Sequence, residues 1–295
     1  MPPTRKHGPV AVLAVIIVLI AVITLLAGSS EAGLLFVLAV APGAFLLWHF
    51  YHADKYKHES IRLLGGTFLI GALSVVPAAL LEGVFAEPPV EAGVLAVFVY
   101  FLFGVGLVEE LMKFLSVRVY SYRSEHFDEP MDGIVFGVAA ALGFATFENI
   151  FYVLRYGIWD AIIRTIVSVP GHAFWGAILG FYLGEAKVRD RPLLAIKGLA
   201  FAVLLHGLFD TLSTEAPNGL IALVLLLALV WIVYFKVVKE EIAEAETESP
   251  YRTQQSSDVL YERPANSRAA TKLCTQCGGA VEPGTRFCAS CGSQL

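Results

Sequence analysis

The sequence predicts an all-α polytopic membrane protein with about eight transmembrane helices and a small C-terminal zinc ribbon. Three observations lead to this fold class. The 295 residues are 57% hydrophobic and 16% charged, with a mean hydropathy of +0.68. The apolar residues gather in segments close to the roughly 20 residues that cross a bilayer. All four cysteines lie near the C-terminal end, outside those segments.

The composition also limits the partners. A chain this apolar is typical of a protein embedded in a lipid bilayer rather than of a soluble globule. The formal net charge is -5 and the basic residues form no stripe along the chain. We therefore expect no nucleic acid as a partner.

Hydropathy divides the chain into eight predicted spans. The first follows Arg5 and Lys6 and resembles a secretory signal, but its apolar stretch is longer than a signal core, and seven more spans follow. We interpret it as an uncleaved first helix. The eight predicted spans are residues 10–27, 33–50, 63–85, 93–117, 131–154, 160–184, 193–213 and 219–238.

The distribution of cations predicts the orientation, because short cytoplasmic loops accumulate Lys and Arg. The connections on the opposite side hold only Arg155, with Arg164 just inside the next span. This asymmetry predicts that both termini are cytoplasmic in the cell membrane. The twelve cations on the first side are Arg5, Lys6, Lys55, Lys57, Arg62, Arg118, Arg123, Lys187, Arg189, Arg191, Lys236 and Lys239.

The C-terminal part has a different composition. Residues 240–271 are rich in Glu, Ser, Thr, Gln and Arg, which predicts a flexible cytoplasmic linker. Residues 272–295 hold two Cys-x-x-Cys pairs, Cys274 with Cys277 and Cys288 with Cys291. Four thiolates at this spacing favour a closed, structural zinc site. Two disulfides are the alternative, which a reducing cytoplasm disfavours.

Glu109, Glu110, Glu148, His172 and His206 are ionisable residues inside the predicted spans, and Lys113 and Asp210 lie one helical turn from two of them. A charge in the hydrocarbon core is costly, so such residues usually belong to a functional site. Glu109 and Glu110 precede Lys113 at helical-neighbour spacings. One of the two carboxylates can pair with the lysine while the other faces a cavity, or both can belong to a simple salt bridge.

Two further features follow on the next two spans. Glu148 and Asn149 come after a stretch of small residues, where Glu148 can orient water, bind a metal or lie at the outer interface. His172 follows Pro170 and Gly171, which predict a broken helix that presents the imidazole to a cavity. A histidine that only makes a packing hydrogen bond is the alternative.

The last feature is His206 with Asp210 one helical turn later. The aspartate can set the imidazole tautomer, or the pair can bind a metal, stabilise an oxyanion or simply join two helices. Four such features on four successive spans predict a single site. Counting about 1.5 Å per residue puts Glu109 nearer the cytoplasm and Glu148 nearer the outer face, so convergence requires a tilt or kink.

The motifs Glu-Glu-x-x-Lys, Phe-x-x-x-Glu-Asn, His after Pro-Gly, and His-x-x-x-Asp resemble those of the PrsW family of polytopic membrane proteases, which is similar to the CAAX prenyl protease and bacteriocin-processing superfamily. The resemblance spans residues 63–238, within a membrane protease domain of residues 1–239, and includes Met131-Asp132-Gly133. It implies hydrolysis of peptide bonds in membrane-protein substrates, such as an anti-sigma factor. It also implies roles for Glu109 in activating water, and for Glu148, His172, His206 and Asp210 as the remaining motif residues. The superfamily commonly has His where this chain has Glu148.

Two mechanisms fit these residues. Glu109 can deprotonate water without a metal, or His172, His206 and carboxylates can hold a divalent ion, for which zinc is the expected metal. Two other classes of function stay open: a transporter in which the buried acids and histidines carry protons or a cation, and a non-catalytic membrane sensor acting through the zinc ribbon. No internal repeat supports the transporter.

Overall fold

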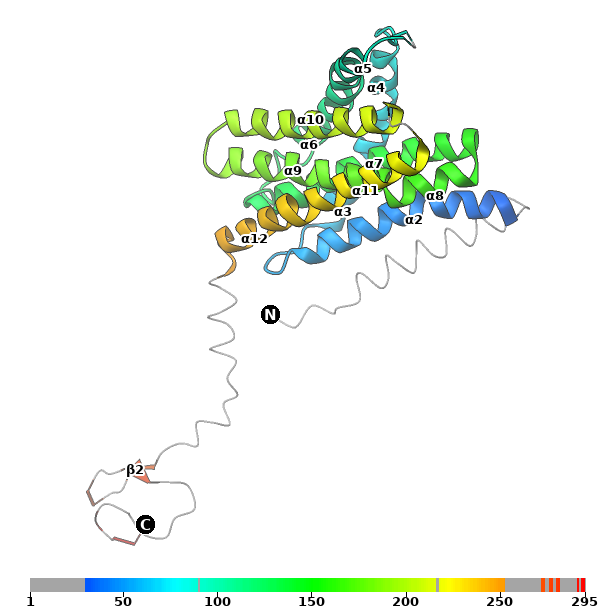
Figure 1. Ribbon diagram of the computed structural model, residues 1–295. Coiled ribbons are helices and arrows are strands. Elements are labelled where there is room, and N and C mark those ends of the chain that lie inside the picture. Colours follow the sequence, from blue (N-terminus) through cyan, green and yellow to red (C-terminus); the bar gives the residue numbers. More distant parts are fainter. Residues whose placement is uncertain are drawn as a thin grey trace. The chain divides into compact units, whose positions relative to one another are not determined.

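The computed structural model describes residues 30–89, 91–215, 218–252, 272–273, 276–277, 280–281, 291 and 293–294. The chain divides into two compact units, Met1–Ser249 and Pro250–Leu295. The first unit is a bundle of helices (Figure 1). Its elements are α2 (Ser30–Ala53), α3 (Ile61–Leu73), α4 (Val75–Glu82), α5 (Val94–Tyr100), the π-helix η1 (Phe101–Gly106), α6 (Leu107–Val119), α7 (Pro130–Tyr156), α8 (Ile158–Ile166), α9 (Ser168–Val188), α10 (Leu193–Glu215), α11 (Gly219–Val233), the π-helix η2 (Tyr234–Val238) and α12 (Lys239–Glu248).

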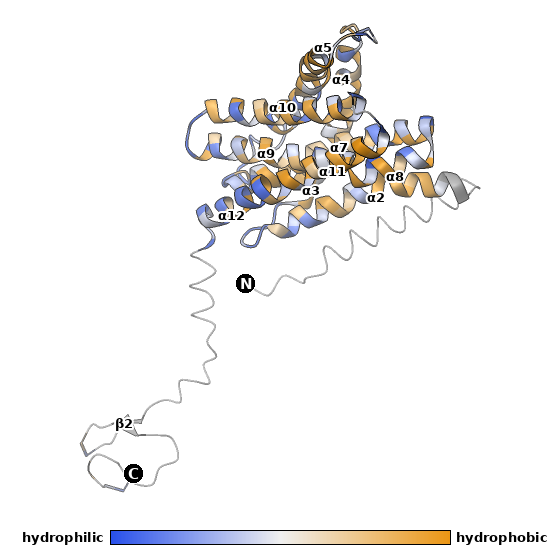
Figure 2. Ribbon diagram, viewed as in Figure 1, coloured by the Kyte–Doolittle hydropathy of each residue, from blue (hydrophilic) through white to orange (hydrophobic). Residues whose placement is uncertain are grey.

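Within the described residues, seven helices are long and apolar enough to cross a membrane, which confirms the predicted polytopic all-α fold. The predicted span at residues 10–27 lies outside the described residues. Hydrophobic colouring runs along the bundle helices, and hydrophilic colouring gathers at the loops and on α12 (Figure 2). The seven are Gly33–Ala53, Ile61–Glu82, Val94–Val119, Pro130–Tyr156, Ile158–Val188, Leu193–Glu215 and Gly219–Glu248.

Helices α7 and α9 form the centre of the bundle and are buried along most of their lengths. They approach closely because glycines face each other: a Cβ atom on Gly180 of α9 would overlap the carbonyl oxygen of Gly133 on α7. In a membrane, close backbone approach at small residues supplies the van der Waals contact that holds helices together. This contact fixes the position of His172 on α9 relative to Glu148 on α7.

The spans that carry His172 and Glu109 both depart from a regular α-helix. The span that contains α8 and α9 breaks at Val167, whose φ of -123° and ψ of -61° are not helical. The break therefore precedes Pro170 and Gly171 instead of occurring at them. Pro170 lies in the first turn of α9, where its missing N–H is not needed. The span that contains α6 is deformed by the π-helix η1 directly before the glutamates.

Helix α7 begins at a capping box. The Glu129 side chain accepts from the backbone of Asp132, the Asp132 side chain accepts from the backbone N–H of Glu129, and Pro130 occupies the first turn. Such reciprocal caps satisfy backbone donors that a helix start leaves without partners. The start of the central helix is therefore strongly fixed.

The C-terminal part differs from the expected layout at one boundary. The segment predicted as a linker from residue 240 begins as helix α12, which continues the last span to Glu248. Residues 253–271 lie outside the described residues. In the second unit, strands β1 (Lys272–Leu273) and β2 (Ala280–Val281) pair antiparallel. Cys277 and Cys291 are exposed, and Cys274 and Cys288 lie outside the described residues.

Candidate active site

Three helices bring five buried polar residues into contact in the interior of the bundle. We call this group the Glu–His cluster; it consists of Glu109, Glu110 and Lys113 on α6, His172 on α9 and His206 on α10. None is more than 6% exposed. The cluster is therefore separated from bulk solvent except where it meets the cavity described below.

The close approach of α10 to the segment before α6 positions the glutamates. Gly106, at the end of η1, lies against α10, where a Cβ atom would be 3.2 Å from the carbonyl oxygen of Val203. Gly207 of α10 lies in turn against Leu102, 2.8 Å from its Cα atom by the same construction. His206 immediately precedes Gly207, so this contact places its ring beside the carboxylates. A π-helix also rotates the residues that follow it, and such segments often occur at functional sites.

Lys113 is the centre of the cluster. Its ammonium donates to Glu110 Oε1 at 2.7 Å, to Glu109 Oε2 at 3.1 Å and to His172 Nδ1 at 2.8 Å. These three bonds use all three of its protons. A fully buried lysine costs several kcal/mol to desolvate, which is tolerable because two carboxylates surround it. Lys113 thus determines where both glutamates and His172 point.

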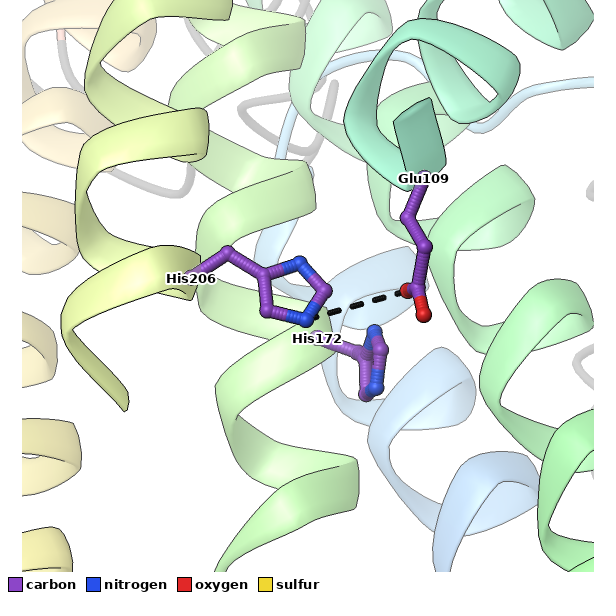
Figure 3. A group of neighbouring side chains, drawn as sticks. All are labelled: Glu109, His172 and His206. Atoms are coloured by element: carbon purple, nitrogen blue, oxygen red, sulfur yellow. Dashed lines mark ion pairs between the residues drawn. The ribbon is translucent and has the colours of Figure 1, made fainter. Parts of the chain in front are cut away.

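His206 has one ring nitrogen held and the other directed to the centre of the site. Its Nδ1 lies 2.8 Å from Glu110 Oε1. Its Nε2 lies 3.8 Å from Glu109 Oε2 and 3.4 Å from Asp210 Oδ2. Figure 3 shows the Glu109 carboxylate and the two imidazole rings directed toward one another. A carboxylate on Nδ1 fixes the ring orientation and makes Nε2 the reactive atom.

His172 lies between the lysine and Glu148. Because Lys113 donates to Nδ1, the proton of the neutral ring is on Nε2, which lies 3.3 Å from Glu148 Oε2. The rings of His172 and His206 meet edge to face, with centroids 5.3 Å apart. The arrangement thus joins all four sequence motifs, through His172 to Glu148 and through His206 to Asp210.

Glu148 is held by Arg164, which the sequence analysis considered only for the orientation of the spans. Arg164 of α8 pairs with Glu148 Oε2 at 2.8 Å and donates to Asn149 Oδ1 at 2.6 Å. Its guanidinium carbon also lies 3.9 Å from the centre of the Tyr152 ring. The sequence does contain an indication of this role, because Arg164 lies inside an apolar segment, where an ionisable residue usually has a function.

The expected separation of Glu109 and Glu148 along the membrane is not an obstacle. The two residues meet the same histidine pair from different sides, Glu109 beside His206 and Glu148 beside His172. The π-helix η1 before Glu109 and the break at Val167 before His172 are the deformations that accompany this convergence.

A cavity of about 1270 Å³ adjoins the Glu–His cluster. It is large enough to admit a polypeptide segment, since ligand pockets usually measure about 300–1,000 Å³. Its wall combines aromatic side chains with carboxylates that the sequence analysis did not single out, Glu82 and Asp160 among them. Polar and aromatic lining residues include Glu82, Tyr100, Glu109, Phe144, Glu148, Tyr152, Asp160, Arg164, His172, His206 and Asp210.

Glu109, His172 and His206 also form a donor set suited to a metal ion. One ligand atom from each lies within 4.8 Å of the others. Two imidazoles and one carboxylate are the ligands of many catalytic zinc sites. His206 fits in detail, because its Nδ1 is held by a carboxylate and its Nε2 faces the site. For His172 to bind a metal, one proton must leave the His172–Lys113 pair.

Comparisons with known proteins place the chain in a family. Residues 59–238 match the family model described as PrsW family intramembrane metalloprotease. Protease PrsW of Bacillus subtilis (strain 168) is 35% identical over 65% of this chain and 88% of its own length. Protease PrsW of Geobacillus kaustophilus is 36% identical over 67% and 88%, and that of Clostridioides difficile 32% over 67% and 87%. No solved structure matches the chain.

Fold and site together define an intramembrane hydrolase: a polytopic membrane protein whose buried carboxylates and histidines meet beside a cavity between its helices. The chain belongs to the PrsW family of intramembrane proteases. The matched region begins four residues before the predicted start at residue 63 and ends with it at residue 238.

Proposed function

We propose that the protein hydrolyses peptide bonds of membrane-protein substrates in the cavity beside the Glu–His cluster, with Glu109 as the group that activates water. The observation that carries this assignment is the meeting of Glu109, His172 and His206 within 4.8 Å. Glu109 is suited to the role because its carboxylate lines the cavity, whereas that of Glu110 is fully buried.

The contacts of the remaining cluster residues indicate the role of each in the reaction. His206, with Asp210 3.4 Å from its Nε2, is placed to donate to the oxyanion that forms when water attacks the scissile carbonyl. Glu110 orients His206, and Lys113 orients Glu109, Glu110 and His172. Glu148, held by Arg164, has its Oε2 atom 3.3 Å from His172 Nε2 and so orients that ring.

Glu109, His172 and His206 would hold a divalent metal if the enzyme uses one. Such an ion, when bound, polarises the scissile carbonyl and acidifies water. The donor set supports this option, as does the description of the family as metalloproteases. Without a metal, Glu109 accepts the proton of the attacking water.

The experiment is cleavage of a panel of single-span membrane proteins by the purified full chain in detergent. We expect cleavage by the wild type and by Glu125→Gln, an exposed control, and loss of cleavage in Glu109→Gln and His206→Ala. Repeating each assay with a chelator separates metal-dependent from metal-free hydrolysis. Cleavage by all four proteins at equal rates would contradict this active site.

We also propose that the substrate is a membrane-anchored regulator such as an anti-sigma factor, as the family resemblance implies. Both termini are proposed to be cytoplasmic, on the basis of the twelve cations on one side of the predicted spans. The cavity then opens toward the outer face, because its lining residues Tyr152 and Glu215 lie at the ends of α7 and α10 farthest from the cation-rich loops.

The C-terminal residues 272–295 are proposed to form a structural zinc ribbon after a linker. The two Cys-x-x-Cys pairs support it, and the antiparallel strands β1 and β2 flank the first pair in the sequence. Metal analysis of the purified chain, with Cys277→Ser as the variant, tests this assignment.

A further inference from the structure

A second group of carboxylates gathers at the start of α7, far from the Glu–His cluster. We call it the carboxylate cluster; it consists of Asp54, in the loop after α2, and Glu129 and Asp132 at the start of α7. One oxygen atom from each lies within 4.8 Å of the others. Sixteen residues of α7 separate Asp132 from Glu148, about 24 Å along a helix. The two groups are therefore separate sites.

All three residues are buried: their exposed fractions are 2% for Asp54 and 0% for Glu129 and Asp132. Exposed acidic groups are common on protein surfaces and need no ligand. Three buried carboxylates that face one another repel strongly and cannot be screened by water. The surroundings must therefore provide positive charge or protons.

Two of the carboxylates are held rigidly by one oxygen each. Asp54 Oδ1 accepts the N–H groups of Tyr56 and Lys57, at 3.1 and 3.0 Å. Asp132 Oδ2 accepts the N–H groups of Asp128 and Glu129, at 2.7 and 2.9 Å. These bonds direct the second oxygen of each residue in a defined direction. The oxygens are thus arranged before any ligand arrives.

Within the part of the chain that the structure describes, the second oxygens, Asp54 Oδ2 and Asp132 Oδ1, are fully buried and have no hydrogen-bond donor. Buried polar atoms in proteins are nearly always satisfied, so each exception needs an explanation. A carboxylate oxygen only accepts, which leaves a proton or a cation as the missing partner. The two unsatisfied oxygen atoms belong to the loop after α2 and to the start of α7, which are far apart in the sequence.

The nearby lysine does not balance the negative charge. Lys57 Nζ pairs with Asp132 at 3.0 Å, but it also pairs with Glu59 at 3.0 Å and with Asp128 at 2.6 Å. Glu59 is itself only 3% exposed. Burial raises the pKa of the Glu59 carboxyl to about 9 and that of Glu129 to about 7, which agrees with a shortage of positive charge.

We propose that Asp54, Glu129 and Asp132 bind a hard divalent cation, Mg²⁺ or Ca²⁺. Oxygen atoms alone form this site, which is the ligand set these cations prefer, whereas zinc favours nitrogen and sulfur. The cation joins the α2–α3 loop to the start of α7. It therefore stabilises the end of the central helix opposite the active site, and the inference does not depend on the proposed proteolytic mechanism.

The test is thermal unfolding of the purified full chain in detergent, after chelation and then with Mg²⁺ or Ca²⁺ added. At a cation concentration about 100 times the Kd, we expect the melting temperature of the wild type to rise by about 5–10 °C. The Asp54→Asn/Asp132→Asn variant should show no rise. Its melting temperature without cation should equal or exceed that of the wild type, because the substitutions remove repulsion.

Two controls identify the responding site. Glu125→Gln removes one exposed negative charge near the same loops, and His206→Ala removes a donor of the Glu–His cluster; both should respond to the cation as the wild type does. If the double variant does not fold, calorimetric titration of the cation into the wild type and into Asp54→Asn replaces thermal unfolding. We then expect the variant to bind the cation at least tenfold more weakly. An unchanged wild type, or equal responses of wild type and variant, would overturn the proposal.

Discussion

The Glu–His cluster and the carboxylate cluster differ in how their charges are balanced. In the Glu–His cluster, Lys113 lies between Glu109 and Glu110, and Arg164 pairs with Glu148 a short distance away. Among the ion pairs described, Lys57 is the cation that meets the carboxylate cluster; it pairs with Asp132 and is shared with Glu59 and Asp128, which lie outside the cluster. The comparison teaches that the first group is built from the chain's own cations, while the second leaves acceptor oxygens for a cation from outside.

The largest effect should come from removing the central lysine. Lys113→Met leaves Glu109 and Glu110 buried without their cation, which should destabilise the protein by about 3–5 kcal/mol and abolish cleavage. Lys57→Met should cost less, because 18% of that side chain is exposed and solvent can screen the acids. Melting temperatures of the two variants in detergent measure the difference. A larger loss in Lys57→Met would reverse the comparison.

The next effect separates the two neighbouring glutamates. Glu110→Gln removes a charged partner of both Lys113 and His206, so we expect a loss of about 1.5–3 kcal/mol in stability together with weaker cleavage. Glu109→Gln should retain most of the stability, since Glu109 faces the cavity and makes the longer bond to Lys113. Thermal unfolding of both variants checks this. Equal stability losses would show that the two carboxylates have the same structural role.

A smaller effect is expected from the helix contact that connects the two groups. Gly180→Ala places a methyl group on the carbonyl oxygen of Gly133, so the α7–α9 contact must open at a cost of about 1–3 kcal/mol. Gly65→Ala on α3 is the matched control, because nothing lies within 4 Å of its added Cβ atom. The control should be neutral or slightly stabilising. Similar melting temperatures for the two variants would argue against tight α7–α9 packing.

The smallest effect concerns the arginine that holds Glu148. Arg164→Lys keeps the charge but cannot bind Glu148 and Asn149 with one planar group, so we expect about a tenfold loss of cleavage rate, or about 1.4 kcal/mol. Arg164→Met, which also removes the charge, should lose more. Initial rates at saturating substrate measure both. An unchanged rate in both variants would mean that Glu148 needs no orientation.

Much of the fold followed from the sequence, because hydropathy and length determine which segments can cross a bilayer. Seven predicted spans are confirmed within the described residues. The break before His172 was expected at Pro170 and lies at Val167, since proline is tolerated in a first helical turn. The extension of α12 to Glu248 was also missed. The charged sequence of α12 does not predict a helix packed against the bundle. Two ion pairs attach it there, Lys55 with Glu246 and Arg189 with Glu248.

The sequence predicted the residues of the active site better than it predicted their geometry. The motifs identified every member of the Glu–His cluster, but not the distances, which depend on the π-helix before Glu109 and on glycine contacts between distant helices. Arg164 was overlooked because its position near a helix end suggested topology instead of pairing. The carboxylate cluster was overlooked because Asp54 is 75 residues from Glu129 in sequence, and only the fold brings them together.

The most direct test of the account is the initial rate at which Glu109→Gln cleaves one substrate that the wild type processes, with the fold of both proteins verified by thermal unfolding. If Glu109 activates water, the rate falls by about 10²–10⁴-fold while the melting temperature stays close to that of the wild type. A rate within twofold of the wild type in a folded variant would show that Glu109 does not activate water.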